Sequence, residues 1–205
     1  MWASCVTENL RTLDLTPEQR RDALERIDQA SAHILSIVDD VLDRARVEAG
    51  AMPIDVTDVE AQDVIAASLA LIQPVAERRG VRVGAAGSAA LGRADRRRLQ
   101  QVIPNLVSNA VRFSGADSAV RVETEALGDE ATAIHVVDQG PGNPAELLAQ
   151  LFVPFDRLGA DAGREGSAGL GLVLARRLTE VMGGTLDLRS TVGVGTHITV
   201  TLAGD

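Results

Sequence analysis

Several residue types are missing or scarce in this chain of 205 residues, and each absence excludes a class of protein. Cysteine occurs once, at Cys5, which excludes an internal disulfide and a cysteine metal cluster and fits a reducing, cytoplasmic setting. No run approaches the roughly 18 apolar residues of a membrane-spanning helix. Residues 1–5 lack the basic start and apolar stretch of a signal peptide. We therefore expect a cytoplasmic chain without membrane contact, although a longer parent protein could be membrane-bound.

Lysine and tyrosine are also absent, so all 20 basic residues are arginines, against 29 acidic residues and a net charge of −9. The excess of acid is spread over the chain, because residues 1–57 hold 11 acids and 6 arginines, and residues 58–205 hold 18 and 14. This balance argues against a nucleic-acid partner or an anionic membrane surface. An anionic ligand would need locally placed arginines and backbone N–H groups. The 45% of hydrophobic residues is enough for a packed core.

Glycine is absent from residues 1–49, and this segment has the pattern of the tail of one helix over residues 3–13 followed by a second, long helix. Thr16-Pro17-Glu18-Gln19 forms a capping-box start, and Gly50 followed by Pro53 is a stop signal. The prediction is a helix over Pro17–Glu48, about 48 Å long at 1.5 Å per residue. Its apolar residues follow a heptad pattern: Leu24, Ile27, Ile34, Val38, Val41 and Ala45. We expect homodimerisation through this stripe, and the alternative is a helix that lies on its own domain.

Residues 58–205 alternate between helical and strand patterns. The first expected helix is Asp58–Arg79, with Val64, Ala67, Leu71 and Val75 on one face. The second is capped by Asp95 and carries the apolar residues Leu99, Val102, Leu106, Ala110 and Phe113. A short helix capped by Asn143 and a helix over Leu170–Met182 follow. Expected strands are Val81–Val83, Ala89–Gly92, Ala119–Ala126, Thr132–Asp138, Thr185–Ser190 and His197–Leu202. Antiparallel hairpins with separate helices predict an α+β fold, a two-layer α/β sandwich preceded by the long helix. The predicted organisation is a partial helical dimerisation domain over 1–49, a linker over 50–57 and a catalytic domain over 58–205.

Five short motifs occur in a fixed order in this second part. Gln101–Phe113 places Asn105 and Asn109 four residues apart, on one helix face, and amide oxygens suit a hard cation such as Mg²⁺. The other four are Asp138-Gln-Gly-Pro-Gly142, Phe152-Val-Pro-Phe155, Gly166-Ser-Ala-Gly-Leu-Gly-Leu172 and Gly193-Val-Gly-Thr196. Each motif is weak alone, since a strand-end turn or helix packing would also use these residues. Their order is specific.

The motif series resembles the ATP-binding domain of sensor histidine kinases, within the superfamily of gyrase, chaperone and mismatch-repair ATPases. The resemblance covers residues 50–203, and the end of the upstream helix, residues 37–50, looks like the second helix of the kinase dimerisation domain. It implies an ATP-dependent protein histidine kinase of two-component signal transduction, a transferase that uses ATP and Mg²⁺ in a phosphorelay. The implied partners are a second copy of the chain, a histidine-bearing dimerisation helix in cis or trans, and a response regulator receiver domain.

The resemblance also assigns roles to individual residues. Asp138 would accept a hydrogen bond from the adenine amine, and Asn109, with Asn105 nearby, would bind Mg²⁺. Arg112 would reach the phosphates, although a solvated helix charge is its plain alternative. The remaining binding residues implied by the motifs are Gly140, Gly142, Phe155, Gly169, Leu170, Gly171, Leu172, Gly195 and Thr196. Arg157 and Arg164 could contact phosphates or be surface charges.

Two features depart from the family pattern. The phosphate-accepting histidine is missing, because His33, His135 and His197 all lack its sequence context and read as structural residues. The acceptor would then belong to an upstream segment or to a separate protein, as in a split kinase. The alternatives are a non-catalytic dimerisation module that keeps the ATPase fold, and a serine kinase of the anti-sigma type, against which the heptad helix speaks. Pro104 is the second departure, since a proline inside the asparagine helix should kink it beside Asn105.

Overall fold

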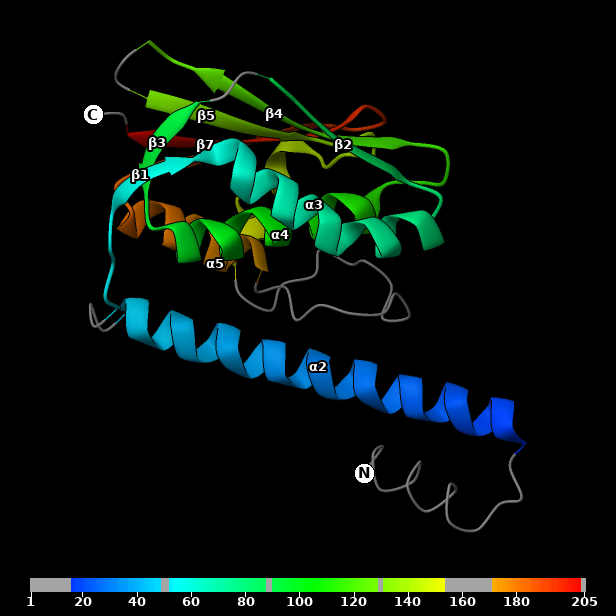
Figure 1. Ribbon diagram of the computed structural model, residues 1–205. Helices are drawn as coiled ribbons and strands as arrows, with labels where there is room; N and C mark the ends of the chain where they lie inside the picture. The colour runs from blue at the N-terminus through cyan, green and yellow to red at the C-terminus, as the bar shows by residue number, and fades with distance from the viewer. Residues whose placement is uncertain (1–15, 49–51, 88–89, 129–130, 154–170, 204–205) are drawn as a thin grey trace. The chain divides into compact units, whose positions relative to one another are not determined.

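The computed structural model describes residues 16–48, 52–87, 90–128, 131–153 and 171–203 (Figure 1). The chain divides into two compact units, Met1–Leu42 and Asp43–Asp205. Predictions for residues 1–15, 49–51 and 154–170 lie outside the described residues. None of the helices within the described ranges is long and apolar enough to cross a membrane.

Helix α2 spans Pro17–Glu48, as the sequence predicts. Its capping box is formed, because the Gln19 N–H donates to Thr16 Oγ1 at 3.2 Å and the Thr16 N–H donates to Gln19 Oε1 at 3.0 Å. Three apolar residues of the first unit's stripe, Leu24, Ile34 and Val38, are between 47% and 60% exposed. These three apolar side chains of the helix are therefore exposed, whereas Ile27 is half-buried.

The second unit is built on a five-stranded sheet with the order β2-β4-β5-β7-β6. The pair β2–β4 is parallel and the other pairs are antiparallel. The strands of this sheet are β2 Arg82–Gly87, β4 Ala119–Ala126, β5 Ala131–Val137, β6 Thr185–Thr191 and β7 Gly195–Ala203. A small second sheet pairs β1 (Thr57–Glu60) with β3 (Leu91–Ala94). Figure 1 shows helices α3 (Ala61–Arg78), α4 (Arg96–Phe113) and α5 (Gly171–Val181) on one face of the large sheet. The predicted two-layer α+β sandwich is confirmed.

The core lies between the helices and that face of the sheet. On β7, Ile198, Val200 and Leu202 are buried, whereas His197, Thr199 and Thr201 alternate with them and lie on the open face. On α4 the predicted apolar positions are buried, except for Phe113, which is half-buried. The alternation in the sequence thus distinguishes the two faces of the sheet correctly.

Two expectations about α3 are wrong. Asp58 does not cap this helix, because it lies in β1 opposite Arg93, and α3 begins only at Ala61. Of the four residues expected on its buried face, Val64 is buried but Ala67, Leu71 and Val75 are exposed. The helix instead buries Ala61, Val64, Ile65, Ser68, Ile72 and Ala76. Apolar residues occur on both faces of α3, so only packing against α4 and the sheet selects the buried one.

The segment after the first glycine motif also differs from expectation. It forms two short 3-10 turns, η1 (Ala145–Leu147) and η2 (Gln150–Phe152), instead of one short helix. Asn143 does not cap the first turn, where Pro144 holds the N-cap position without a side-chain bond. The Asn143 N–H instead donates to Ser190 Oγ at 2.8 Å, which ties this loop to β6.

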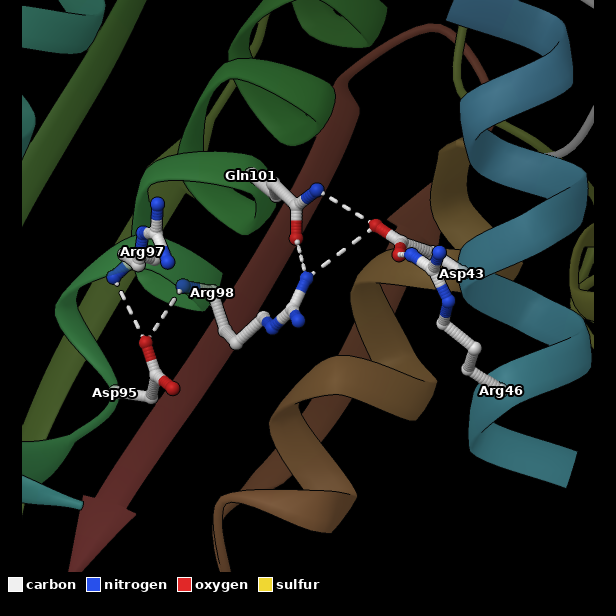
Figure 2. Close-up of polar contacts among 6 residues, drawn as sticks. All are labelled: Asp43, Arg46, Asp95, Arg97, Arg98 and Gln101. Atoms are coloured by element: carbon white, nitrogen blue, oxygen red, sulfur yellow. Dashed lines mark hydrogen bonds and ion pairs between the residues drawn. The ribbon is translucent and has the colours of Figure 1, made fainter. Parts of the chain in front are cut away.

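The start of α4 is fixed by charged residues on both sides (Figure 2). Asp95 caps the helix as predicted, accepting from the N–H groups of Arg97 and Arg98 at 2.9 and 3.2 Å. Burial raises the pKa of Asp95, but its three backbone hydrogen bonds, from Asp55, Arg98 and Arg97, and the Arg98 guanidinium together outweigh burial and lower it. Within the same compact unit, Asp43 Oδ2 accepts from Arg98 Nη1 at 3.3 Å.

Candidate functional site

Helix α4 carries Asn105 and Asn109 on one face, half-buried, as the four-residue spacing predicts. Asn109 Oδ1 accepts a hydrogen bond from Arg112 Nη2 at 3.3 Å. The Arg112 guanidinium also stacks on the Phe113 ring, 4.5 Å from its centroid. Pro104 lies inside α4, which continues through it to Phe113. The structure therefore brings the three predicted residues of this helix together.

The first turn of α5 lies against the same helix face. A Cβ built on Gly171 would lie 3.8 Å from Asn105 Oδ1, so the α5 backbone approaches that amide closely. The N–H groups of a first helical turn have no intrahelical acceptor, and they favour anions. The Asn105 amide therefore lies beside the backbone at the first described turn of α5. Amide oxygens suit a hard cation and free N–H groups suit phosphate oxygens.

Asp138 follows β5 directly and is 9% exposed. Its Oδ1 accepts two hydrogen bonds, from the Gly140 N–H at 2.8 Å and from the Thr196 N–H at 3.1 Å. Burial raises the pKa of Asp138, and these two N–H groups act in the opposite direction. Among the described residues, Oδ2 of Asp138 has no hydrogen-bond partner. The carboxylate is thus held rigidly by one oxygen and keeps the other available to a donor.

The glycines of the first and third glycine motifs sit where no side chain fits. Gly142 has φ +66°, and an added Cβ would lie 2.0 Å from the Thr191 carbonyl oxygen. Gly195 has φ +135°, and its Cβ would lie 2.0 Å from the Asp138 carbonyl oxygen. Both contacts are far below van der Waals separation, so glycine is required for the β6–β7 hairpin to reach the Asp138 motif.

Gly140 joins this motif to α4. Its Cβ would lie 3.0 Å from the carbonyl oxygen of Phe113, the last residue of that helix. Asn109 stands four residues earlier, which is about 6 Å along the axis. The asparagines, the buried carboxylate and the glycine backbone therefore border one region at the C-terminal half of α4.

Sequence reasoning missed Ser190, which organises the hairpin beside Asp138. Its Oγ accepts from the Asn143 N–H, donates to the Gly195 carbonyl at 3.0 Å, and lies 3.0 Å from Thr196 Oγ1. A serine in an edge strand carries no motif, so only the pairing of β6 with β7 could reveal this role. Gln139, inside the first glycine motif, has a structural contact that its motif does not predict, because its Oε1 accepts from the Ala119 N–H at 3.0 Å.

The remaining predicted residues divide into two groups. Leu172 is half-buried and packs against the core, and Phe152 lies under the Arg176 guanidinium, 4.7 Å from its ring centroid. Phe155, Gly169 and Leu170, together with Arg157 and Arg164, lie outside the described residues.

The described residues thus combine a buried carboxylate with one open oxygen, a pair of helix amides and a glycine at the start of α5. Residues 94–204 match the family described as histidine kinase-, DNA gyrase B- and HSP90-like ATPase, and the chain belongs to that family. It contains an ATP-binding domain of the histidine kinase type.

Curated relatives point the same way. An uncharacterized sensor-like histidine kinase of Rhizobium meliloti is 34% identical over 195 residues, which are 93% of this chain and 37% of the relative. The sensor protein KdpD of Rathayibacter rathayi is 39% identical over 171 residues, 83% of this chain and 19% of the relative. The chain thus spans only about a fifth to just over a third of the length of these relatives.

Solved structures share the fold. Full-length ShkA, in complex with AMPPNP, superposes with a TM-score of 0.77 at 30% identity, over 96% of this chain and 41% of ShkA. The Acinetobacter baumannii histidine kinase AdeS superposes with a TM-score of 0.75 at 18% identity, over 99% and 95% of the two chains. At 18% identity the likeness to AdeS concerns the fold alone.

Proposed function

We propose that this chain is the ATP-binding part of a sensor histidine kinase and transfers the γ-phosphoryl group of ATP to a histidine outside this chain. The observation that carries the proposal is the Asp138 carboxylate, which is fixed by two backbone N–H groups and offers its second oxygen to a ligand. A carboxylate in that state is suited to the exocyclic amine of adenine. Gly140, Gly142, Gly195 and Thr196 form the backbone around it.

The amides of α4 fit Mg²⁺, since both are neutral oxygen ligands at half-buried positions. Asn109 would bind the cation through Oδ1, which requires the Arg112 guanidinium to leave that oxygen, and Asn105 would lie beside it. Arg112, once released, would neutralise phosphate charge. When bound, the cation would supply further neutralisation of the phosphates.

The phosphoryl transfer requires few other groups from this domain. The bond between the γ-phosphorus and the bridging oxygen breaks, a phosphorus–nitrogen bond to the acceptor imidazole forms, and ADP leaves. Catalysis of such a transfer is mainly positioning and charge neutralisation. Gly169–Leu172 at the start of α5 would hold the phosphates by backbone N–H groups, and Phe155 would anchor the preceding loop.

The partners follow from the first unit and from the missing acceptor. The exposed apolar residues of α2 support a homodimer through this helix. The acceptor histidine would stand on a dimerisation helix, upstream in the same protein or in a separate one, and a response regulator receiver domain would take the phosphoryl group next. The proposed domains are a partial helical dimerisation domain over 1–49, with the tail of a first helix and the whole second helix, a linker over 50–57 and a catalytic domain over 58–205.

Calorimetric titration with ATP, with and without Mg²⁺, tests the binding step. Asn109→Ala should abolish the Mg²⁺-dependent part of the affinity, while Gln100→Ala, an exposed position on the same helix, should leave it unchanged. Radiolabelled ATP then tests transfer to purified histidine-bearing dimerisation domains. Mg²⁺-dependent binding without transfer to any acceptor would favour the non-catalytic interaction module, and no binding at millimolar ATP would refute the proposal.

A further inference from the structure

Two histidines and a threonine meet on the open face of the sheet, away from the helices. His135 lies on β5, and His197 and Thr199 lie on β7. His197 Nε2 lies 3.1 Å from His135 Nδ1, and Thr199 Oγ1 lies 3.2 Å from His135 Nδ1 and 3.4 Å from His197 Nε2. These three atoms form a nearly equilateral triangle with two imidazole nitrogens and one hydroxyl oxygen.

We propose that His135, His197 and Thr199 form a binding site for one Zn²⁺ or a similar borderline divalent cation, with the fourth position open to water. A tetrahedral Zn²⁺ with bonds of about 2.0–2.1 Å separates its ligand atoms by about 3.3–3.4 Å. The three measured separations, 3.1, 3.2 and 3.4 Å, are close to that requirement. Adjacent strands hold the ligands, since His135 pairs with Thr199 in the β5–β7 register.

A carboxylate stands behind one of the ligands. Glu125 Oε2 lies 3.3 Å from His135 Nε2, on the side of the ring opposite the triangle. The Nε2–H of His135 would donate to this carboxylate, which leaves Nδ1 with its lone pair directed to the cation. Metal-binding histidines commonly donate their second N–H to a carboxylate in this way, and the contact raises the basicity of the ligand.

The open face around the three ligands also carries charged side chains. Charged residues on this face are mixed, with Glu123, Glu125 and Asp187 against Arg121 and Arg189.

The third ligand is a hydroxyl, which is weaker than a third imidazole or a carboxylate. In the described part of the chain no group of three His, Cys, Asp or Glu side chains is placed to hold a metal ion. We therefore expect binding at micromolar Zn²⁺ instead of the tight binding of a structural zinc site. Bound Zn²⁺ would join β5 to β7, whose ends carry Asp138 and Thr196.

Calorimetric titration with ZnCl₂ tests the site on the full chain without a polyhistidine tag, in a Cys5→Ser background and without nucleotide. One Zn²⁺ should bind, and His197→Ala should weaken binding at least tenfold, whereas His33→Ala should not change it. Thr199→Val should weaken it and Thr201→Val, on the same face of β7, should not. Glu125→Gln should weaken it about tenfold.

Circular dichroism spectra verify that each variant is folded, and Zn²⁺ should raise the unfolding temperature of the parent chain but not of the His197→Ala chain. Equal Zn²⁺ affinity in the parent and His197→Ala chains would overturn the proposal. Absence of saturable binding at 1 mM Zn²⁺ would also overturn it, and the two rings would then only share a proton.

Discussion

Replacing Asp138 with asparagine separates the two roles of this side chain. Asparagine keeps Oδ1, so it can still accept from the N–H groups of Gly140 and Thr196. It replaces the open Oδ2 with an NH₂ group, which cannot accept from the adenine amine. Loss of a hydrogen bond to a charged group costs about 1.5–3 kcal/mol. At about 1.4 kcal/mol per factor of ten, the Kd for ATP should rise about 10- to 150-fold.

The same substitution should not destabilise the protein without nucleotide. Because burial raises the pKa of Asp138, ionising this carboxyl is less favourable in the folded chain than in the unfolded chain. The folded-state pKa of Asp138 therefore lies above the unfolded value of about 3.9. At a pH above both pKa values the carboxylate is charged and lowers the free energy of unfolding, and at a pH below both it is protonated and this destabilisation disappears. The stability of the Asp138→Asn variant relative to the parent should therefore increase as the pH rises from about 3 through the raised pKa.

Calorimetry of ATP binding and urea unfolding between pH 3 and 7 measure these two effects. Asp187→Asn is the matched control, because it makes the same change at an exposed position on β6 and should leave both quantities unchanged. An unchanged ATP affinity in Asp138→Asn would refute the role of the open oxygen. A loss of stability at pH 7 would refute the account of the buried charge.

Three further predictions concern the scaffold. Gly195→Ala should destabilise the fold by more than about 1 kcal/mol, because Gly195 has a positive φ and the added Cβ would contact the Asp138 carbonyl. Gly115→Ala is the control and should be tolerated, since nothing lies within 4 Å of its added Cβ. Urea unfolding of the two variants measures the difference. Asp95→Ala should cost about 1–3 kcal/mol in urea unfolding, because it removes the two hydrogen bonds of a helix cap and one further backbone contact, from the Asp55 N–H. A change below about 0.5 kcal/mol would contradict this. His197 has a lowered folded pKa, so its contribution to stability is present above the unfolded value of about 6.5 and is lost as the pH falls. With chelator present, His197→Gln should therefore weaken the pH dependence of the unfolding temperature between about pH 7 and 5.

Much of the fold could be predicted because local signals agreed with the tertiary structure. The bounds of β4 (Ala119–Ala126) and α2 (Pro17–Glu48) coincide with the prediction, and the Thr16–Gln19 capping box and the Asp95 cap are present. Such signals depend only on residues within a few positions, and alternation of apolar residues marks the buried face of a strand. The histidine kinase resemblance rested on motif order, which the family match over residues 94–204 supports.

The errors all occurred where distant segments compete for the same residues. Asp58 is a good helix cap by type, but pairing with Arg93 placed it in a strand. Asn143 is also a good cap, yet its N–H is bound to Ser190 on a strand 47 positions away. Leu71 and Val75 have helical spacing but lie on the solvent side of α3. Propensity and spacing do not contain these long-range contacts.

The sequence alone determined the class of fold, the long helix and the residues on which nucleotide binding would depend. The motif residues carry their chemistry in their type, such as a carboxylate, amides and glycines. Only the tertiary structure decided that Asp138 keeps one oxygen open, because that depends on Gly140 and Thr196 meeting the other. It also placed His135 beside His197, 62 residues apart, and so turned two ordinary strand residues into a candidate metal site.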